Sequence, residues 1–259
     1  MTRVGAREST SVRAKTVKAS TRLAREIVET MYVNGMGPGD HYLSESDALK
    51  RHGVGRGTYR EALRFLESLG IVTIRSGPGG GAVISEPNSG EVASTVALWL
   101  QFSRAPLRTV LEARHAIEPG IAQLASLNAT DEEIVAMELD LLEAEAEIGN
   151  FRTFLPAYLR FWRHLAESTH NPLLALLSPA LRTIVNSAGF VPDEPYRVQI
   201  LGYLRNVHGA VGRRDPDAAA VAMRDLEAEF NRRLAEGYPR QLERVVAWSA
   251  LEAPDPDEG

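Results

Sequence analysis

Three arginines at helical spacing offer the plainest chemistry in this sequence. Arg56, Arg60 and Arg64 recur every four residues within residues 56–69, where the apolar positions have the period of an amphipathic helix. At 100° per residue they fall within about 80° of one another, turned away from the centre of the apolar face. Arginine near the start of such a helix is the commonest bidentate reader of guanine. A stripe of this kind can also be a solvated surface, so its neighbours in the chain decide between the two interpretations.

The segments around the stripe are those of a DNA-binding unit. Helical periodicity marks residues 20–34, and a short second helix begins at Ser44, where Ser44-Glu-Ser-Asp47 resembles a capping box with Asp in place of Glu. After the third helix, β-branched runs at 71–74 and 82–84 flank a glycine-rich stretch, which predicts a hairpin. This order predicts a winged helix-turn-helix over 20–86, preceded by a disordered arm over 1–19.

In that fold the third helix enters the major groove. We therefore expect Arg56 and Arg60 to read base edges. We expect Thr58 and the glycine wing, Gly79–Gly81 at the tip of the hairpin, to lie near phosphates or the minor groove. The full set of candidate DNA-binding residues is Arg56, Thr58, Arg60, Ser44, Arg64, Gly79 and Gly80.

The charge distribution points in the same direction. Residues 1–85 carry 13 basic and 8 acidic side chains, whereas the whole chain carries 29 basic and 34 acidic side chains. A basic head on an acidic body suggests nucleic acid at one end and another partner at the other, although chance asymmetry gives the same totals.

The rest of the chain reads as helix. We expect a linker helix over 87–105, an antiparallel bundle of six or seven helices over 106–250, and an acidic tail over 251–259. Thr130-Asp-Glu-Glu133 is a capping box, and Pro172 and Pro216 stand at helix starts. Predicted helices span about 106–127, 130–148, 151–169, 172–188, 195–213, 215–236 and 239–250. The fold class is mainly α, with the hairpin as its β-structure.

Several function classes are disfavoured by what the sequence lacks. It has no cysteine, no apolar run of 18 residues and no signal-peptide pattern, so we expect a cytoplasmic protein without disulfides and with no membrane partner. Its lysines are Lys15, Lys18 and Lys50, so the C-terminal part offers no Schiff-base lysine. Patterns typical of hydrolases, P-loops and zinc proteases are absent, and we do not expect an enzyme.

The head resembles the DNA-binding domain of GntR-family transcription regulators. The resemblance rests on Pro38–Asp40, Ser44-Glu45, Val54–Arg56, Tyr59–Leu63, Leu66–Gly70 and the glycine wing. The chain departs from the family pattern at Gly55, Gly57 and Ser46, where the family usually has a serine cap, a side chain and an arginine. Fewer side-chain contacts predict weaker or altered base reading.

The body resembles the FCD domain of the FadR subfamily. The segments that carry this resemblance are Leu111–Pro119, Phe161–Pro172, Val207–Asp215 and Ala218–Met223. It implies an effector-binding bundle that forms a homodimer, a palindromic operator on double-stranded DNA, and a function in regulation, most often repression.

Many FCD domains hold a metal, and the resemblance places those four ligand positions on Tyr158, Trp162, Leu204 and Leu226. Phenol is a poor ligand, and indole and leucine side chains do not bind divalent metals. His208 lies one turn beyond Leu204 and has no partner that the sequence identifies. We therefore expect no metal and no other cofactor.

The expected effector pocket is apolar and aromatic. Its candidate residues are Arg114, Tyr158, Trp162, Leu204, His208 and Leu226. Arg114 would bind a carboxylate or phosphate, or instead pair with Glu118 one turn away. Such a pocket suits a hydrophobic acid such as a fatty acid or an acyl-CoA.

Other interpretations stay open at this point. In one, the bulky residues fill the metal cavity and the bundle acts only in dimerisation, in a regulator or an architectural DNA-binding protein. In another, the bundle itself binds or converts a small molecule and the head is an adaptor.

Overall fold

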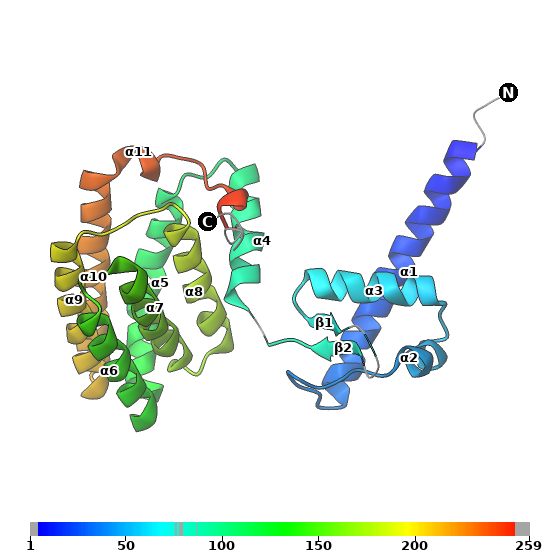
Figure 1. Cartoon of the computed structure of the whole chain (residues 1–259), viewed down its shortest axis with the longest axis horizontal. Helices are drawn as coiled ribbons and strands as arrows, with labels where there is room; N and C mark the ends of the chain where they lie inside the picture. The colour runs from blue at the N-terminus through cyan, green and yellow to red at the C-terminus, as the bar shows by residue number, and fades with distance from the viewer. Residues whose placement is uncertain (1–4, 76, 78–79, 87, 252–259) are drawn as a thin grey trace. The chain divides into compact units, whose positions relative to one another are not determined.

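The computed structural model describes residues 5–75, 77, 80–86 and 88–251, with the backbone alone for residues 5–18. The chain divides into two compact units after Asn88 (Figure 1). We call the first unit the head and the second the body.

The head has the predicted winged helix-turn-helix architecture. Its helices are α1 (Gly5–Val33), α2 (Glu45–His52) and α3 (Arg56–Ser68), and its hairpin pairs β1 (Val72–Arg75) with β2 (Gly81–Ile84) antiparallel. Val72 faces Ile84 and Arg75 faces Gly81 across the ladder. The structure thus confirms the order of elements that the sequence predicted.

Local chemistry sets the ends of the short helices. The Ser44 hydroxyl caps α2 by accepting from the backbone N–H of Asp47, which is one half of the expected capping box. Gly53 ends α2 with φ +62°, a left-handed conformation that glycine adopts without steric cost. The apolar faces of the three helices and the hairpin then close one core, whose largest members are Leu23, Ile27, Met31, Tyr42, Tyr59, Leu63 and Leu66.

The first helix is longer than predicted. It begins at Gly5, so residues 5–19 of the expected disordered arm are helical, and only residues 1–4 of that arm lie outside the described ranges. From Ala6 to Val33 the sequence has neither glycine nor proline, so nothing in the local sequence stops a helix once the buried part nucleates it. The polar composition of residues 5–19 therefore did not predict their helical structure.

The body is a helical bundle. Its helices are α4 (Ser89–Phe102), α5 (Arg108–Asn128), α6 (Asp131–Ala146), α7 (Phe151–Glu167), α8 (Pro172–Asn186), α9 (Glu194–Gly212) and α10 (Pro216–Gly237). The predicted capping box forms in full, because Thr130 and Glu133 each accept from the other's backbone N–H. Side-chain caps at Asn171, Asp193 and Asp215 start α8, α9 and α10. Helix α5 packs against α10, and α6 packs against α7.

The predicted helix over 239–250 is wrong. Only the short α11 (Pro239–Leu242) and a 3-10 turn, η1 (Trp248–Leu251), occur there. Between them Val245 forms a bridge with Pro106, and the N–H of Val246 donates to the carbonyl of Ala105. These backbone groups are satisfied by the segment before α5, so a helix is not needed to pair them.

We call residues 238–251 the C-terminal strap. The strap continues onto α4, where the Trp248 indole N–H donates to Ser94 Oγ at 2.6 Å and its backbone N–H donates to Gln101 Oε1 at 2.7 Å. It therefore joins the end of α10 to α4. None of the helices in the described ranges combines the length and apolarity that crossing a bilayer requires.

Candidate DNA-reading face and effector cavity

The arginine stripe is exposed on α3. The side chains of Arg56 and Arg60 are 79% and 64% exposed, and Arg64 is exposed one turn further on. Arg56 is the first residue of the helix, and its N-cap Gly55 makes no side-chain hydrogen bond. The positive end of the helix dipole and two guanidinium groups therefore occupy the same end of the helix.

Glu45 joins the two leading arginines. Its Oε1 lies 3.8 Å from Arg56 Nε, and its Oε2 accepts a hydrogen bond from Arg60 Nη2 at 3.4 Å. Glu45 is the first residue of α2, so the turn between the helices brings its carboxylate to the start of α3. These two contacts with Glu45 hold the guanidinium groups of Arg56 and Arg60 near one another.

The wing borders the same surface. One hollow is lined by Glu45, Arg60, Arg64, Arg75 and the wing glycines Gly77, Gly80 and Gly81, among others. Arg75, at the end of β1, was not among the predicted residues, and the packing of the hairpin brings it to the same hollow as Arg60 and Arg64 of α3. Thr58 is half-buried, and Ser44 serves as the cap of α2. Gly79 lies outside the described residues.

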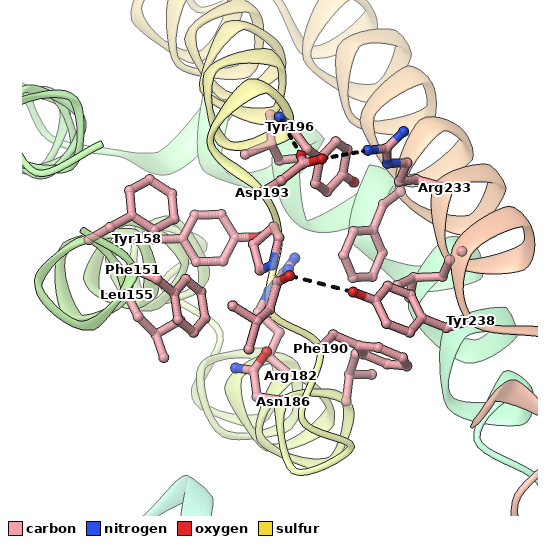
Figure 2. Close-up of a pocket in the computed structure, with 18 of the residues that line it drawn as sticks. Phe151, Leu155, Tyr158, Arg182, Asn186, Phe190, Asp193, Tyr196, Arg233 and Tyr238 are labelled. Carbon is pink, nitrogen blue, oxygen red and sulfur yellow. Dashed lines mark hydrogen bonds and ion pairs between the residues drawn. The ribbon is translucent and has the colours of Figure 1, made fainter. Parts of the chain in front are cut away.

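The body contains a cavity of about 540 Å³ between α5, α7, α8, α9 and α10. Figure 2 shows side chains from these elements converging on it. Its aromatic lining residues are Phe151, Phe154, Tyr158, Phe190, Tyr196, Phe230 and Tyr238, and its charged ones are Arg114, Arg182, Asp193, Arg233 and Glu236. A pocket of this size and composition is typical of small-molecule sites.

The segment between α8 and α9 closes one side of this cavity. Asp193 pairs with Arg233 of α10 at 3.2 Å, and the Tyr238 hydroxyl donates to the carbonyl of Val191 at 3.4 Å (Figure 2). The ring of Phe190 meets that of Tyr238 edge-on, with centroids 4.9 Å apart. Two polar contacts and one aromatic contact therefore hold this segment against the end of α10.

A cluster of four buried charges borders the cavity. Arg114 donates to Glu227 Oε1 at 2.7 Å and lies 3.7 Å from Glu118, while Arg182 Nη2 lies 3.0 Å from Glu118 Oε1. Burial opposes the charge on Arg114, but Glu227 and Glu118 outweigh it and raise its pKa. Burial and the neighbouring Arg114 lower the pKa of Arg182. Two arginines and two glutamates leave the cluster with no net charge.

Arg182 differs from Arg114 in its surroundings. Its guanidinium carbon lies 3.1 Å from the centroid of the Trp162 ring, a cation–π contact. Within the described part of the chain, no atom accepts a hydrogen bond from Arg182 Nε, and Arg182 Nη2 meets Glu118 Oε1 as an ion pair without hydrogen-bond geometry. The buried hydroxyl of Tyr196 also has no acceptor in that part of the chain.

The structure separates the predicted effector residues into two groups. Arg114 and Tyr158 line the cavity. Trp162, Leu204 and Leu226 are almost fully buried in the core of the bundle and do not line it. The grouping of all six around one pocket is therefore corrected, because the large apolar side chains fill the centre of the bundle and the cavity lies beside them.

His208 also lies away from the cavity. Its Nδ1 is 3.2 Å from Glu138 Oε2, and its Nε2 is 3.0 Å from the carbonyl of Ile134. The four positions that the resemblance gave to metal ligands hold phenol, indole and two leucines, which is not a ligand set for a divalent cation. In the described ranges, no group of three or more His, Asp or Glu side chains is placed to hold a metal.

Cavity residues that the sequence did not predict lie on α7, α8 and α9 and in two further regions. One is the segment after α8, with Phe190 and Asp193, and the other is the end of α10, with Arg233 and Tyr238. No pattern in either segment marks a site, since their proximity depends on how α8, α9 and α10 pack. Arg182 gave one signal only, because it is the one charged residue of α8.

Comparison with known proteins gives consistent results. A model of the FCD domain matches residues 109–228. The galactonate operon transcriptional repressor of Escherichia coli K12 is 27% identical over 229 residues, covering 86% of this chain and 97% of that protein. The Uxu operon transcriptional regulator of the same organism is 29% identical over 219 residues, covering 81% and 82%.

A solved structure shares the fold. That of Streptococcus agalactiae GntR aligns with a TM-score of 0.65 at 21% identity, covering 82% of this chain and 99% of that one.

Proposed function

The chain belongs to the GntR-family transcription regulators that carry an FCD domain, and from this premise we propose that it is a repressor controlled by an apolar effector in the body. The observation that carries the DNA-binding half is the exposed pair Arg56 and Arg60 at the start of α3, beside the wing. Exposed cations at a helix N-terminus suit base edges and phosphates.

The operator we propose is a palindrome bound by a homodimer. A two-fold symmetric dimer presents two copies of α3, and the half-sites then repeat about one helical turn apart or a multiple of it. A gel shift with the DNA upstream of the protein's own gene tests this. Sequence-specific binding supports a regulator, binding to any DNA supports an architectural protein, and no binding contradicts both.

The effector we propose is a hydrophobic acid or its acyl derivative, such as a fatty acid or an acyl-CoA. The aromatic and aliphatic lining of the cavity supports an apolar body, and the buried arginines at its inner side support a ligand with an oxygen-bearing end. The galactonate repressor is named for a hydrophilic acid, so galactonate is the natural contrast among the compounds tested.

The experiment is a thermal-shift series with the full chain, followed by the gel shift with each ligand that binds. A ligand at 100 times its dissociation constant should stabilise the protein by about 2.7 kcal/mol. Release of the operator by the same ligand supports control of repression. Stabilisation by galactonate alone would contradict the apolar effector.

The second candidate is a regulator whose body acts only in dimerisation. It is favoured by the filled centre of the bundle, where Trp162, Leu204 and Leu226 are almost fully buried. Under this alternative no ligand stabilises the protein, and operator binding depends only on dimer concentration.

A further inference from the structure

The charges around the effector cavity are already balanced. Arg114 and Arg182 are paired with Glu227 and Glu118, and none of these four side chains is more than 5% exposed. Nearer the rim, Arg233 pairs with Asp193 at 3.2 Å, and Glu236 pairs with Arg232 at 2.7 Å. Each charged residue that lines the cavity therefore has a partner of opposite sign.

Some buried hydrogen-bond donors at the cavity have no acceptor among the described residues. Arg182 is 4% exposed and Tyr196 is 6% exposed, and both line the cavity. Among the described residues, none accepts a hydrogen bond from Arg182 Nε, Arg114 Nε or the Tyr196 hydroxyl, whereas Arg182 Nη2 lies 3.0 Å from Glu118 Oε1. Glu118 Oε2 and Glu227 Oε2 also have no donor there, but neither glutamate lines the cavity. Unpaired buried donors are costly, so an acceptor oxygen from a ligand would gain more here than at a surface.

These two observations together define the polar end of the ligand. A free carboxylate would satisfy the donors, but it would also add a third negative charge to a buried cluster that holds two positive and two negative charges. An unbalanced buried charge is strongly disfavoured. A carbonyl oxygen satisfies the same donors and leaves the charge unchanged.

We propose that Arg182 and Tyr196 hold the polar end of the effector and that this end is an uncharged carbonyl, as in an ester, thioester or amide, rather than a free carboxylate. This inference rests on the proposed effector function and narrows it. It favours acyl derivatives over free fatty acids as the effector. The apolar lining alone does not distinguish these two classes, because both have an apolar chain. Arg114 has the role of a positioning residue, because its Nη2 donates to Glu227 and its Nε faces Glu118 Oε1 at 3.7 Å.

The test uses three probes with the same chain, namely octanoate, octanamide and methyl octanoate, with 3-phenylpropanoate and 3-phenylpropanamide as a ring-bearing pair. Binding to the full chain is followed by the fluorescence of Trp162 in a W99F/W248F background. These two tryptophans are exposed, and Trp162 lies directly against the Arg182 guanidinium. Because the Trp248 indole also bonds the strap to Ser94, affinities in this background are compared with those of the wild type by thermal shift. We expect the amides and the ester to bind at least about tenfold more tightly than the matching acids at neutral pH.

Variants locate the contact. Tyr196→Phe removes the hydroxyl without leaving a hole, and it should weaken amide and ester binding by about threefold to tenfold with little change in thermal stability. Tyr203→Phe, on the same helix but outside the cavity, is the matched control and should leave binding unchanged. Arg182→Met combined with Glu118→Gln keeps the cluster neutral and should weaken binding at least about tenfold.

The outcomes separate this inference from the proposed function. Tighter binding of the acids than of their amides would overturn the uncharged end and leave an apolar effector standing. Equal binding by wild type and both cavity variants would overturn the assignment to Arg182 and Tyr196. If none of the five probes binds, both the effector function and this inference are rejected.

Discussion

The head and the body both place arginines beside glutamates, but in opposite surroundings. In the head, Arg56 and Arg60 meet Glu45 at 3.8 and 3.4 Å with most of their side chains in water. In the body, Arg114 meets Glu227 at 2.7 Å with neither side chain more than 3% exposed. Exposed pairs are worth little and are easily exchanged, whereas a buried pair cannot lose one member cheaply.

This difference in burial agrees with the function that we propose for each unit. The arginines of the head must leave Glu45 to meet DNA, and weak pairing lets them do so. Those of the body must stay in place to keep a cavity wall, and buried pairing holds them. The same two residue types thus give an exchangeable contact in one unit and a fixed scaffold in the other.

The largest expected effect tests the buried side of this comparison. Arg114→Met leaves two buried glutamates with one arginine and should lower the free energy of unfolding by about 3–5 kcal/mol. The check is denaturant unfolding of the full chain. Arg108→Met is the matched control on the same helix, because Arg108 is half-exposed and pairs with Glu112 and Glu243. Equal losses in the two variants would break the comparison.

The next effect tests the exposed side. Arg60→Ala should weaken the specific operator by about 1–3 kcal/mol more than it weakens random DNA, because a bidentate contact to guanine is lost. Fluorescence anisotropy with both DNAs measures this, and unfolding should change by less than about 0.5 kcal/mol. Arg25→Ala, an exposed arginine of α1, controls for loss of charge alone. If Arg60→Ala weakens both DNAs equally, Arg60 contacts only phosphate.

A smaller effect asks what Glu45 contributes. Glu45→Gln frees Arg56 and Arg60, so affinity for random DNA should rise by less than about 1 kcal/mol and the preference for the operator should fall. Glu61→Gln removes one exposed charge from α3 itself, and it should raise affinity for both DNAs alike. Competition binding at two salt concentrations distinguishes them. An unchanged preference in Glu45→Gln would show that the pair does not orient the arginines.

The smallest effect concerns the start of α3. Gly55 has φ −80° and open space where a Cβ would lie, so serine fits without strain. Gly55→Ser should stabilise the head by a few tenths of a kcal/mol by supplying the missing cap. Thermal unfolding measures this, with Gly57→Ala as the comparison for a side chain added without a cap. A loss of stability in Gly55→Ser would mean that the hydroxyl does not cap the helix.

The sequence predicted features whose causes are local. The turn glycines, the caps at Ser44 and Thr130 and the stripe on α3 are each determined within a few residues, and the structure has them. Predictions that needed packing were less accurate. The chain after Pro239 pairs with residues before α5 instead of forming a long helix, and Trp162 lies in the core rather than on the cavity wall.

The cavity itself could not be predicted for the same reason. Asp193 and Arg233 are 40 residues apart, and their pairing depends on how α9 meets α10. The four buried charges come from three helices, and only Arg114 and Glu118 have a spacing that predicts a contact. The sequence shows which residues can pair locally, whereas the packing decides which donors remain without an acceptor.

The C-terminal strap has a thermodynamic consequence for the cavity. Tyr238 is both a wall of the cavity and the first residue of the strap, whose far end is bonded to Ser94 and Gln101 of α4. Occupancy of the cavity and docking of the strap on α4 are thus two equilibria that share one covalently continuous segment. Linkage makes any coupling between them reciprocal. A change at α4 that alters strap docking then changes ligand affinity by the same factor that the ligand imposes on docking.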